Sequence, residues 1–334
     1  MTVPLPRLLI DPAEQHGVAA FSRDLAAAVS AVLGRDLGVA LATLKDADAA
    51  TRVHAQFTDR LWGASPEQAA EAFERFAARF PVTVTLHDLP QRSDGERNLP
   101  RRSACYRRVV AAAAGVVCNS RHEALLLAEF VVAGAEPAVI PLPVDLEPAP
   151  RIRPEPDGDV AIIGFVYPGK GHAEVVAALA ALAELTGTAT APARLVALGR
   201  ASAGHEDELA ALIADAAARG VEVSATGYLD AATLLERCRG TAVPVAAHQH
   251  VSASGSIATW IAGGRRPLVP DTRYSREMAA LRPGTLTLYG SGLLPDAIEA
   301  ARRDPASTWL GADAVTGPDN EAVARAYLAW WESR

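Results

Sequence analysis

Short apolar runs alternate with amphipathic stretches along nearly the whole chain of 334 residues. The apolar runs have the length of buried strands, and the longer stretches repeat hydrophobic positions at helical spacing. The predicted strands cover 8–10, 39–44, 52–57, 82–86, 115–118, 138–140, 160–164, 194–198, 221–225, 241–245, 267–269 and 285–288. The predicted helices cover 18–33, 66–80, 101–113, 121–132, 173–185, 206–219, 231–238, 255–262 and 320–333. Strands separated by helices indicate parallel βαβ units, with both faces of each sheet covered.

The alternation breaks once, between Glu136 and Asp159, where seven prolines stand among few helix-forming residues. This composition is typical of a semi-rigid linker. The sequence therefore predicts an α/β protein with two Rossmann-like, doubly wound domains: 1–145 with the last helix (320–334), and 146–319. Ligands of such sheets bind beyond the carboxyl ends of the strands, so we expect a cleft site between the two domains.

Composition and charge argue against several classes of protein. Half of the residues are hydrophobic and 21% are charged, which is typical of a globular protein, and a net charge of −7 argues against nucleic-acid binding. Three scattered cysteines fit a reducing compartment and support neither a disulfide framework nor a thiolate zinc site. We expect a cytoplasmic protein with no signal peptide and no membrane span, whose membrane contact, if any, is peripheral.

Lys170 stands between Gly169 and Gly171, where a predicted strand passes into a predicted helix. Of 32 basic side chains only Lys45 and Lys170 are lysines, so a lysine at this position indicates a specific use of its compact ammonium. An ammonium beside the free N–H groups of a helix N-terminus forms a site for phosphate. The alternative is an ordinary turn with a solvated lysine.

Several segments, taken in order, resemble the GT-B-fold glycosyltransferases, above all the retaining, nucleotide-sugar-dependent family 4. These segments are 16–21, 53–57, 85–88, 116–120, 139–145, 164–171, 195–199, 226–229 and 262–269. The resemblance implies that a hexose moves from an NDP-sugar to a carbohydrate or small hydroxylated acceptor, with no metal and no cofactor. General likeness to actinobacterial-looking polysaccharide enzymes favours GDP-mannose over a UDP-linked donor.

The resemblance and the chemistry of the residues themselves together indicate the candidate site residues. His87 and Lys170 are the catalytic candidates. The donor-binding candidates are Gly17, Gly164, Lys170, Arg200, Tyr228, Ser254, Gly255 and Ser256. Asp88, Arg97 and Arg101 are the acceptor-binding candidates. Alternatively, His87 is an ordinary strand-end histidine, Asp88 caps the following helix, and the arginines between residues 92 and 108 form a solvated helix face.

The chain departs from the family pattern at two places. Phe165 stands where the family carries a phosphate-binding arginine, which Arg200, Arg273 or Arg276 could replace. Val251 and Thr259 stand where it carries two glutamates. These departures leave open a non-catalytic relative that binds a nucleotide sugar or a partner. A sugar-nucleotide epimerase of the same fold is the other alternative, but it would need carboxylates in the cleft, so the missing glutamates count against it. The spacing of His248 and His250 would also suit a metal, but no third ligand is evident nearby.

Overall fold

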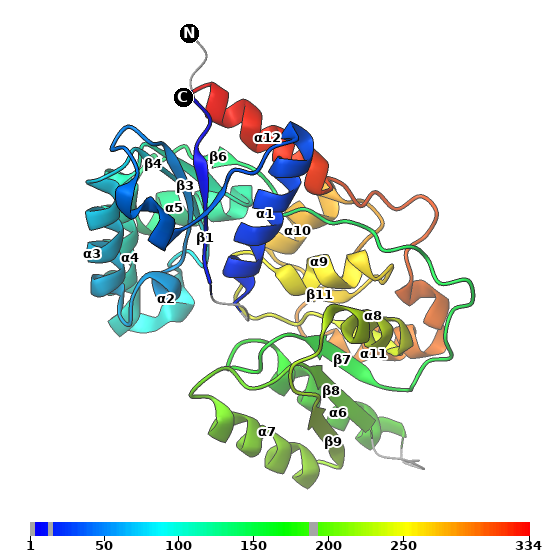
Figure 1. Ribbon diagram of the computed structural model, residues 1–334. Helices are drawn as coiled ribbons and strands as arrows, with labels where there is room; N and C mark the ends of the chain where they lie inside the picture. The colour runs from blue at the N-terminus through cyan, green and yellow to red at the C-terminus, as the bar shows by residue number, and fades with distance from the viewer. Residues whose placement is uncertain (1–3, 13–15, 187–192) are drawn as a thin grey trace. The chain divides into compact units, whose positions relative to one another are not determined.

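The computed structural model describes residues 4–12, 16–186 and 193–334. The chain divides into two compact units: the part up to Pro143 together with Pro318–Arg334, and Val144–Gly317. Each unit contains a six-stranded parallel sheet flanked by helices (Figure 1). The first crossing between the units thus lies inside the proline-rich segment. In the described residues, no helix has both the length and the apolar character needed to cross a bilayer.

The sheet of the first unit has the strand order β2-β1-β3-β4-β5-β6. Its strands are β1 (Arg7–Ile10), β2 (Gly38–Ala40), β3 (Val53–Phe57), β4 (Val82–Leu86), β5 (Gly115–Cys118) and β6 (Ala138–Val139). Its helices are α1 (Gly17–Leu33), α2 (Asp59–Trp62), α3 (Pro66–Ala77), α4 (Gly95–Ala112), α5 (Arg121–Phe130) and α12 (Asn320–Glu332). Two 3₁₀ turns, η1 (Leu41–Asp46) and η2 (Arg92–Asp94), complete the unit.

The centre of this unit is the pair β3 and β4, in which every residue is buried. The two strands pair in register from Val53 opposite Val82 to Phe57 opposite Leu86. One hydrophobic cluster joins these strands to α3 and α4. A second cluster joins the sheet to α1 and α12, which lie side by side (Figure 1). Burial on both faces explains why β4 is a nearly continuous β-branched run.

A chain of buried polar groups ties α12 to the sheet. The Tyr327 hydroxyl lies 2.8 Å from Oγ1 of Thr85, which lies 3.1 Å from Nε2 of His54. The His54 ring also meets the Trp331 ring edge-on, with centroids 5.1 Å apart. Because each of these polar groups has a partner, the network fixes the position of the last helix against β3 and β4.

The sheet of the second unit has the strand order β12-β11-β10-β7-β8-β9. Its strands are β7 (Val160–Ile163), β8 (Ala193–Leu198), β9 (Val221–Ala225), β10 (Val243–Val245), β11 (Leu268–Pro270) and β12 (Thr287–Tyr289). Its helices are α6 (His172–Thr186), α7 (Glu206–Ala218), α8 (Ala231–Gly240), α9 (Gly255–Ala262), α10 (Arg273–Leu281), α11 (Leu294–Arg303) and the 3₁₀ turn η3 (Pro305–Thr308). Alternate residues of β7 belong to two hydrophobic clusters, Ile162 to one and Ile163 to the other, as expected for a sheet covered on both faces.

Some elements differ from the sequence prediction. The strand predicted at 39–44 ends at Ala40 and continues as η1. Helix α4 begins at Gly95, six residues before the predicted start, and it accommodates Pro100 in its second turn. The helices α2, α10 and α11 were not predicted. In α11 the buried residues Leu294, Ile298 and Ala301 follow helical spacing, so this helix could have been predicted from the sequence.

Candidate functional site

Lys170 lies in the loop that joins β7 to α6, and only 7% of its surface is exposed. The loop turns at Gly171, where φ is +101° and a side chain would collide with the carbonyl oxygen of Ala247. At the end of β7, a β-carbon on Gly164 would lie 3.3 Å from Nζ of Lys170. Glycine at these two positions therefore lets the backbone approach the buried ammonium closely.

The Lys170 ammonium has two hydrogen-bond partners. Nζ lies 2.9 Å from Nε2 of His248 and donates to Oγ of Ser256 at 3.3 Å. Nδ1 of His248 lies 3.3 Å from the carbonyl oxygen of Ala246, which can only accept. The ring proton is therefore on Nδ1, and Nε2 accepts from the ammonium. The third N–H of Nζ has no protein partner among the described residues.

Helix α9 begins beside this ammonium. Ser254 caps the helix by accepting a hydrogen bond from the backbone N–H of Ile257 at 3.3 Å, and its hydroxyl lies 3.1 Å from that of Ser256. The N-terminus of an α-helix carries a partial positive charge and free N–H groups. Lys170, His172, His248, Ser254 and Ser256 are hereafter the Lys170 cluster.

Burial sets the charges in the Lys170 cluster. Loss of hydration lowers the pKa of Lys170 from 10.5 to about 8. Burial, followed by repulsion from Lys170, lowers the pKa of His172 to about 3 and that of His248 well below 6.5. The two imidazoles are therefore neutral at neutral pH, while the ammonium is charged. Both ring nitrogens of His172 are buried without a hydrogen-bond partner among the described residues, as expected where a ligand completes the site.

Two further donor candidates lie near the carboxyl ends of neighbouring strands. Arg200 follows β8, and its guanidinium stacks over the ring of Phe165, which follows β7. Tyr228 follows β9 and is 66% exposed; the preceding residue, Gly227, donates its N–H to the carbonyl of Gly199 at 2.9 Å. Arg200 and Tyr228 thus belong to loops at the same edge of the sheet as the Lys170 cluster.

In the first unit, His87 follows β4 and is 5% exposed. Its Nε2 lies 2.8 Å from Oε1 of Gln56 on β3. Because a carbonyl oxygen only accepts, Nε2 carries the proton and Nδ1 is an acceptor. Burial and then the nearby His16 lower the pKa of His87 to about 3, so the ring is neutral. His87 is therefore suited to hydrogen bonding and not to carrying charge.

Asp88 is the only non-glycine residue with positive φ in the described part of the chain, at +49°. Arg102 and Tyr106 donate to its carbonyl oxygen at 2.5 and 3.2 Å, and Thr58 donates to its carboxylate at 3.3 Å. The alternative role as a helix cap is wrong, because the next helical turn begins at Arg92 and is capped by Gln91. A strained residue held in place by several donors is typical of a functional site.

Gly17 begins α1 near the same sheet edge. Its neighbour His16 caps the helix, with Nδ1 accepting from the N–H of Val18 at 3.2 Å. Burial lowers the pKa of His16, and the nearby Asp88 opposes this shift. A β-carbon on Gly17 would meet nothing within 4 Å, so the backbone here is open to approach.

The arginines that follow Asp88 are mostly engaged. Arg101 makes a bidentate ion pair with Glu67 of α3, with both distances at 2.8 Å. The others bind as follows: Arg92 to Glu129, Arg102 to Asp59 and Asp94, Arg107 to the carbonyl of Val131, and Arg108 to Glu74. Arg97 is exposed. Acidic residues outside the segment thus offset its positive charge, which favours the solvated helix face over an anion-binding patch.

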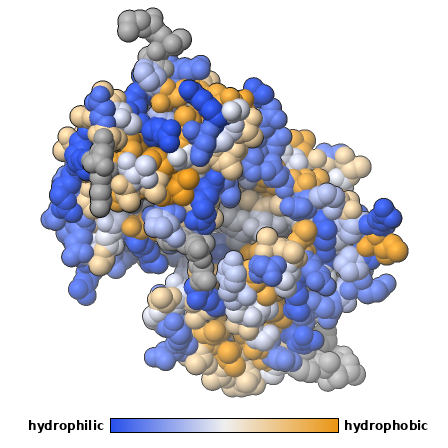
Figure 2. Space-filling view, viewed as in Figure 1, coloured by the Kyte–Doolittle hydropathy of each residue, from blue (hydrophilic) through white to orange (hydrophobic). Residues whose placement is uncertain are grey.

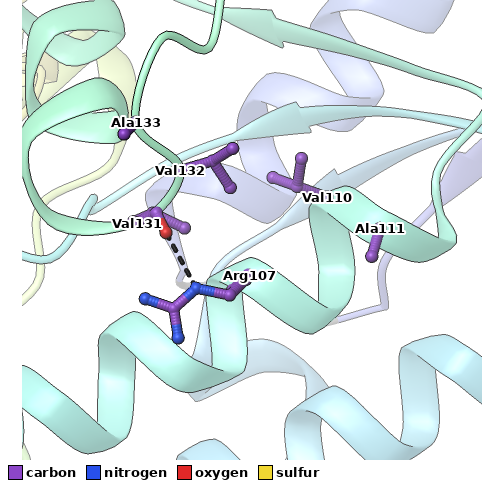
Figure 3. Close-up of a pocket in the computed structure, with 6 residues that line it drawn as sticks. All are labelled: Arg107, Val110, Ala111, Val131, Val132 and Ala133. Carbon is purple, nitrogen blue, oxygen red and sulfur yellow. Dashed lines mark hydrogen bonds between the residues drawn. The ribbon is translucent and has the colours of Figure 1, made fainter.

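A cavity of about 500 Å³ lies elsewhere in the first unit, between α4 and the chain that follows α5 (Figure 3). Its wall is largely apolar: Val110, Ala111, Val131, Val132 and Ala133. Its one cationic group, Arg107, donates to the backbone carbonyl of Val131 at 2.9 Å. None of the candidate site residues lines this cavity.

The structure thus brings the candidates together in two groups. Gly164, Lys170, Ser254, Gly255 and Ser256 gather in the second unit; Gly17, His87 and Asp88 gather in the first. His172 and His248 were not predicted as partners of Lys170. The histidines at 248 and 250 were noticed only for metal spacing, and in the described residues no cluster of three or more potential ligands could hold a metal ion.

Comparison with known proteins supports the architecture. Residues 40–148 match the family described as Glycosyltransferase Family 4. A search of curated proteins gives no match.

Among solved structures, sucrose-phosphate synthase from Thermosynechococcus elongatus is similar over 84% of this chain and 71% of its own, with 15% identity and a TM-score of 0.58. HepE of Anabaena, solved with UDP-glucose, is similar over 92% of this chain and 82% of its own, with 17% identity and a TM-score of 0.57. TarM is similar over 87% of this chain at 12% identity and a TM-score of 0.59, but this chain spans only 53% of TarM. The predicted GT-B fold, with two Rossmann-like units, is confirmed.

Proposed function

We propose that this protein is a retaining, metal-independent glycosyltransferase that moves a hexose from an NDP-sugar to a carbohydrate or small hydroxylated acceptor. The second unit binds the donor and the first unit binds the acceptor. The family match over residues 40–148 and the GT-B fold support the reaction class. The Lys170 cluster is the observation that carries the proposal.

The Lys170 cluster supports a diphosphate site. It combines a buried ammonium with a spare N–H, the N-terminus of α9 and an unpartnered buried imidazole. Fixed donors in a buried site stabilise the charge that builds up on a departing phosphate without reorganisation during the reaction. Lys170, Ser254 and Ser256 would therefore hold the phosphate groups, and Arg200 would add a second cation.

In the proposed reaction the bond between the anomeric carbon and the β-phosphate oxygen breaks. The acceptor oxygen forms the new bond to that carbon, and its proton moves to the leaving phosphate. His87, neutral and fixed by Gln56, would contact the donor sugar, and Asp88 would orient the acceptor hydroxyl. Holding the donor sugar and the acceptor hydroxyl in the reactive geometry supplies a large part of the rate enhancement.

Two nucleotide sugars, GDP-mannose and UDP-glucose, are the candidate donors. The likeness in sequence favours GDP-mannose, whereas HepE is solved with UDP-glucose. Both donors therefore belong in the first experiment. The cytoplasmic location stays a prediction.

The test is a thermal-shift screen with UDP, GDP, ADP and their hexose conjugates, followed by turnover with the donor that binds. A ligand specific for the folded state at a hundred times its dissociation constant adds about 2.7 kcal/mol to the stability. We expect one nucleotide to raise the melting temperature, and Lys170→Ala to abolish that shift while Lys45→Ala retains it. An equal shift in both variants would contradict a donor site at Lys170.

A non-catalytic binding protein is the second candidate function. Phe165, Val251 and Thr259 favour it, because they stand where the family pattern has a phosphate-binding arginine and two glutamates. Nucleotide-sugar binding without transfer or hydrolysis, over a panel of acceptors, would support this candidate. An epimerase is less well supported, since no carboxylate contacts the Lys170 ammonium among the described residues.

A further inference from the structure

The hydrogen-bond partners of the Lys170 ammonium are both uncharged, which is unusual for a buried cation. A buried charge is normally paired with an opposite charge, because burial alone is costly. Here the partners are an imidazole nitrogen of His248 and the hydroxyl of Ser256. Other titratable groups on the neighbouring segments are His172 and Glu174 in the first turn of α6 and His250 beside Gly169. None of these three makes a hydrogen bond to the ammonium in the described structure.

We infer that His248 is a positioning residue for Lys170: it directs the ammonium without cancelling its charge, which stays available to a phosphate oxygen of the donor. This inference rests on the proposed function. A carboxylate in place of His248 would hold the ammonium equally well, but the pair would be neutral and would compete with the phosphate. The neutral imidazole avoids that competition and leaves the third N–H of Nζ for the ligand.

The tautomer of His248 makes this arrangement possible. The carbonyl of Ala246 accepts the Nδ1 proton, so Nε2 presents a lone pair to Lys170. Because an accepted hydrogen bond favours the charged form of the donor, His248 opposes the effect of burial on Lys170. Without this acceptor the ammonium would lose its proton at a lower pH. Binding of a diphosphate should favour the charged form further, with uptake of a proton when the pH exceeds the pKa of free Lys170.

The first experiment measures Lys170 directly and needs no substrate. The chain has only two lysines, so lysine-selective ¹³C and ¹⁵N labelling in a Lys45→Arg background leaves one signal to titrate by NMR. We expect Lys170 to titrate near pH 8. His248→Leu should lower that midpoint by about one unit, the equivalent of one hydrogen bond. His248→Gln, which retains an acceptor oxygen, should restore most of the difference, and His250→Leu should have no effect.

The second experiment measures binding of UDP and of inorganic pyrophosphate by calorimetry from pH 6 to pH 9, in buffers of different ionisation enthalpy. After the protons exchanged by the ligand's own phosphate groups are subtracted, wild type should take up close to one proton per ligand bound at pH 9 and almost none at pH 6. In His248→Leu, affinity should be lost at a lower pH than in wild type. The difference in pH should equal the change in the titration midpoint of Lys170 measured by NMR. An unchanged midpoint in a folded His248→Leu would overturn the inference, even if affinity fell. If neither ligand bound while the midpoint still moved, the donor proposal would fail and the link between His248 and Lys170 would stand.

Discussion

The guanidinium carbon of Arg200 lies 5.6 Å from the centre of the Phe165 ring. The two residues follow neighbouring strands, and the N–H of Val166 donates to the carbonyl of Arg200 at 2.8 Å, which fixes the two loops together. The family 4 pattern has an arginine at position 165. In this chain the aromatic ring at that position instead supports an arginine from the adjacent strand, since a cation is stabilised over an aromatic face.

We expect Arg200 to supply the second positive charge for the diphosphate. Arg200→Ala should weaken binding of the preferred nucleotide about tenfold, the effect of one charge-assisted hydrogen bond. Phe165→Leu should have a smaller effect in the same direction, because it removes only the supporting ring. Calorimetric titration at low salt measures both. The matched control is Arg219→Ala, which removes an exposed ion pair with Asp215 of α7. Unchanged affinity in Arg200→Ala would contradict this role for Arg200.

Lys170 should lower the stability of the ligand-free protein. The folded-state pKa of about 8 lies below the ordinary value of 10.5, so the cost of keeping the charge buried is complete below pH 8. The cost falls as the pH rises from 8 to 10.5 and is absent above that range. A shift of this size corresponds to a cost of about 3 kcal/mol. A variant without the ammonium is relieved of this cost but also loses the hydrogen bond to His248, which contributes about 1 kcal/mol.

Lys170→Met should therefore raise the free energy of unfolding by about 2 kcal/mol at pH 7 and lower it by about 1 kcal/mol above pH 10.5, where only the lost hydrogen bond remains. Urea unfolding of both proteins across this range measures the difference. A variant that is less stable than wild type at pH 7 would show that the ammonium stabilises the fold, against our expectation.

Gly171 should tolerate no side chain. Its φ of +101° and the proximity of the Ala247 carbonyl both exclude a β-carbon. Gly171→Ala should cost more than about 2 kcal/mol and weaken nucleotide binding, since the loop that carries Lys170 must move away from Ala247. Gly204→Ala is the matched control: φ is +81° there as well, but a β-carbon meets nothing within 4 Å. The control should cost only about 1 kcal/mol. Equal losses in the two variants would mean that φ alone matters at Gly171.

The sequence predicted the fold better than the site. The alternation of strands and helices and the proline-rich segment indicated two doubly wound domains, and β4, β5, β9 and α9 have the predicted bounds. The place of Lys170 in the loop between β7 and α6 was also readable from its flanking glycines, whereas its contact with phosphate stays a prediction. The partner His248 was not, because residues 170 and 248 meet only when β10 pairs with β7. Likewise, most of the acidic partners of the arginines after Asp88 lie on α2, α3 and α5, and a count of charges within the segment does not reveal partners so distant in sequence.

Buried histidines should make the protein sensitive to acid. Burial lowers the pKa of His54 to about 3, below its ordinary value of 6.5, while Thr83 and Thr85 occupy both ring nitrogens. The unfolded state therefore binds more protons between pH 6.5 and pH 3, and stability is lost as the pH falls through this window. His54→Leu should reduce the dependence of unfolding free energy on pH by about 1.4 kcal/mol per unit between pH 4 and pH 6. Urea midpoints at several pH values measure the slope, and an unchanged slope would mean that His54 accepts a proton without unfolding.

Asp88 offers a way to separate backbone conformation from charge. Asparagine tolerates positive φ almost as well as aspartate, whereas alanine does not. Asp88→Asn should therefore keep the melting temperature near that of wild type, and Asp88→Ala should lower the stability by about 1 kcal/mol. If the carboxylate orients the acceptor hydroxyl, both variants should lose about a hundredfold in kcat/KM for the acceptor while nucleotide affinity stays unchanged. Full activity in Asp88→Asn would show that the strained backbone, and not the charge, is what the site requires.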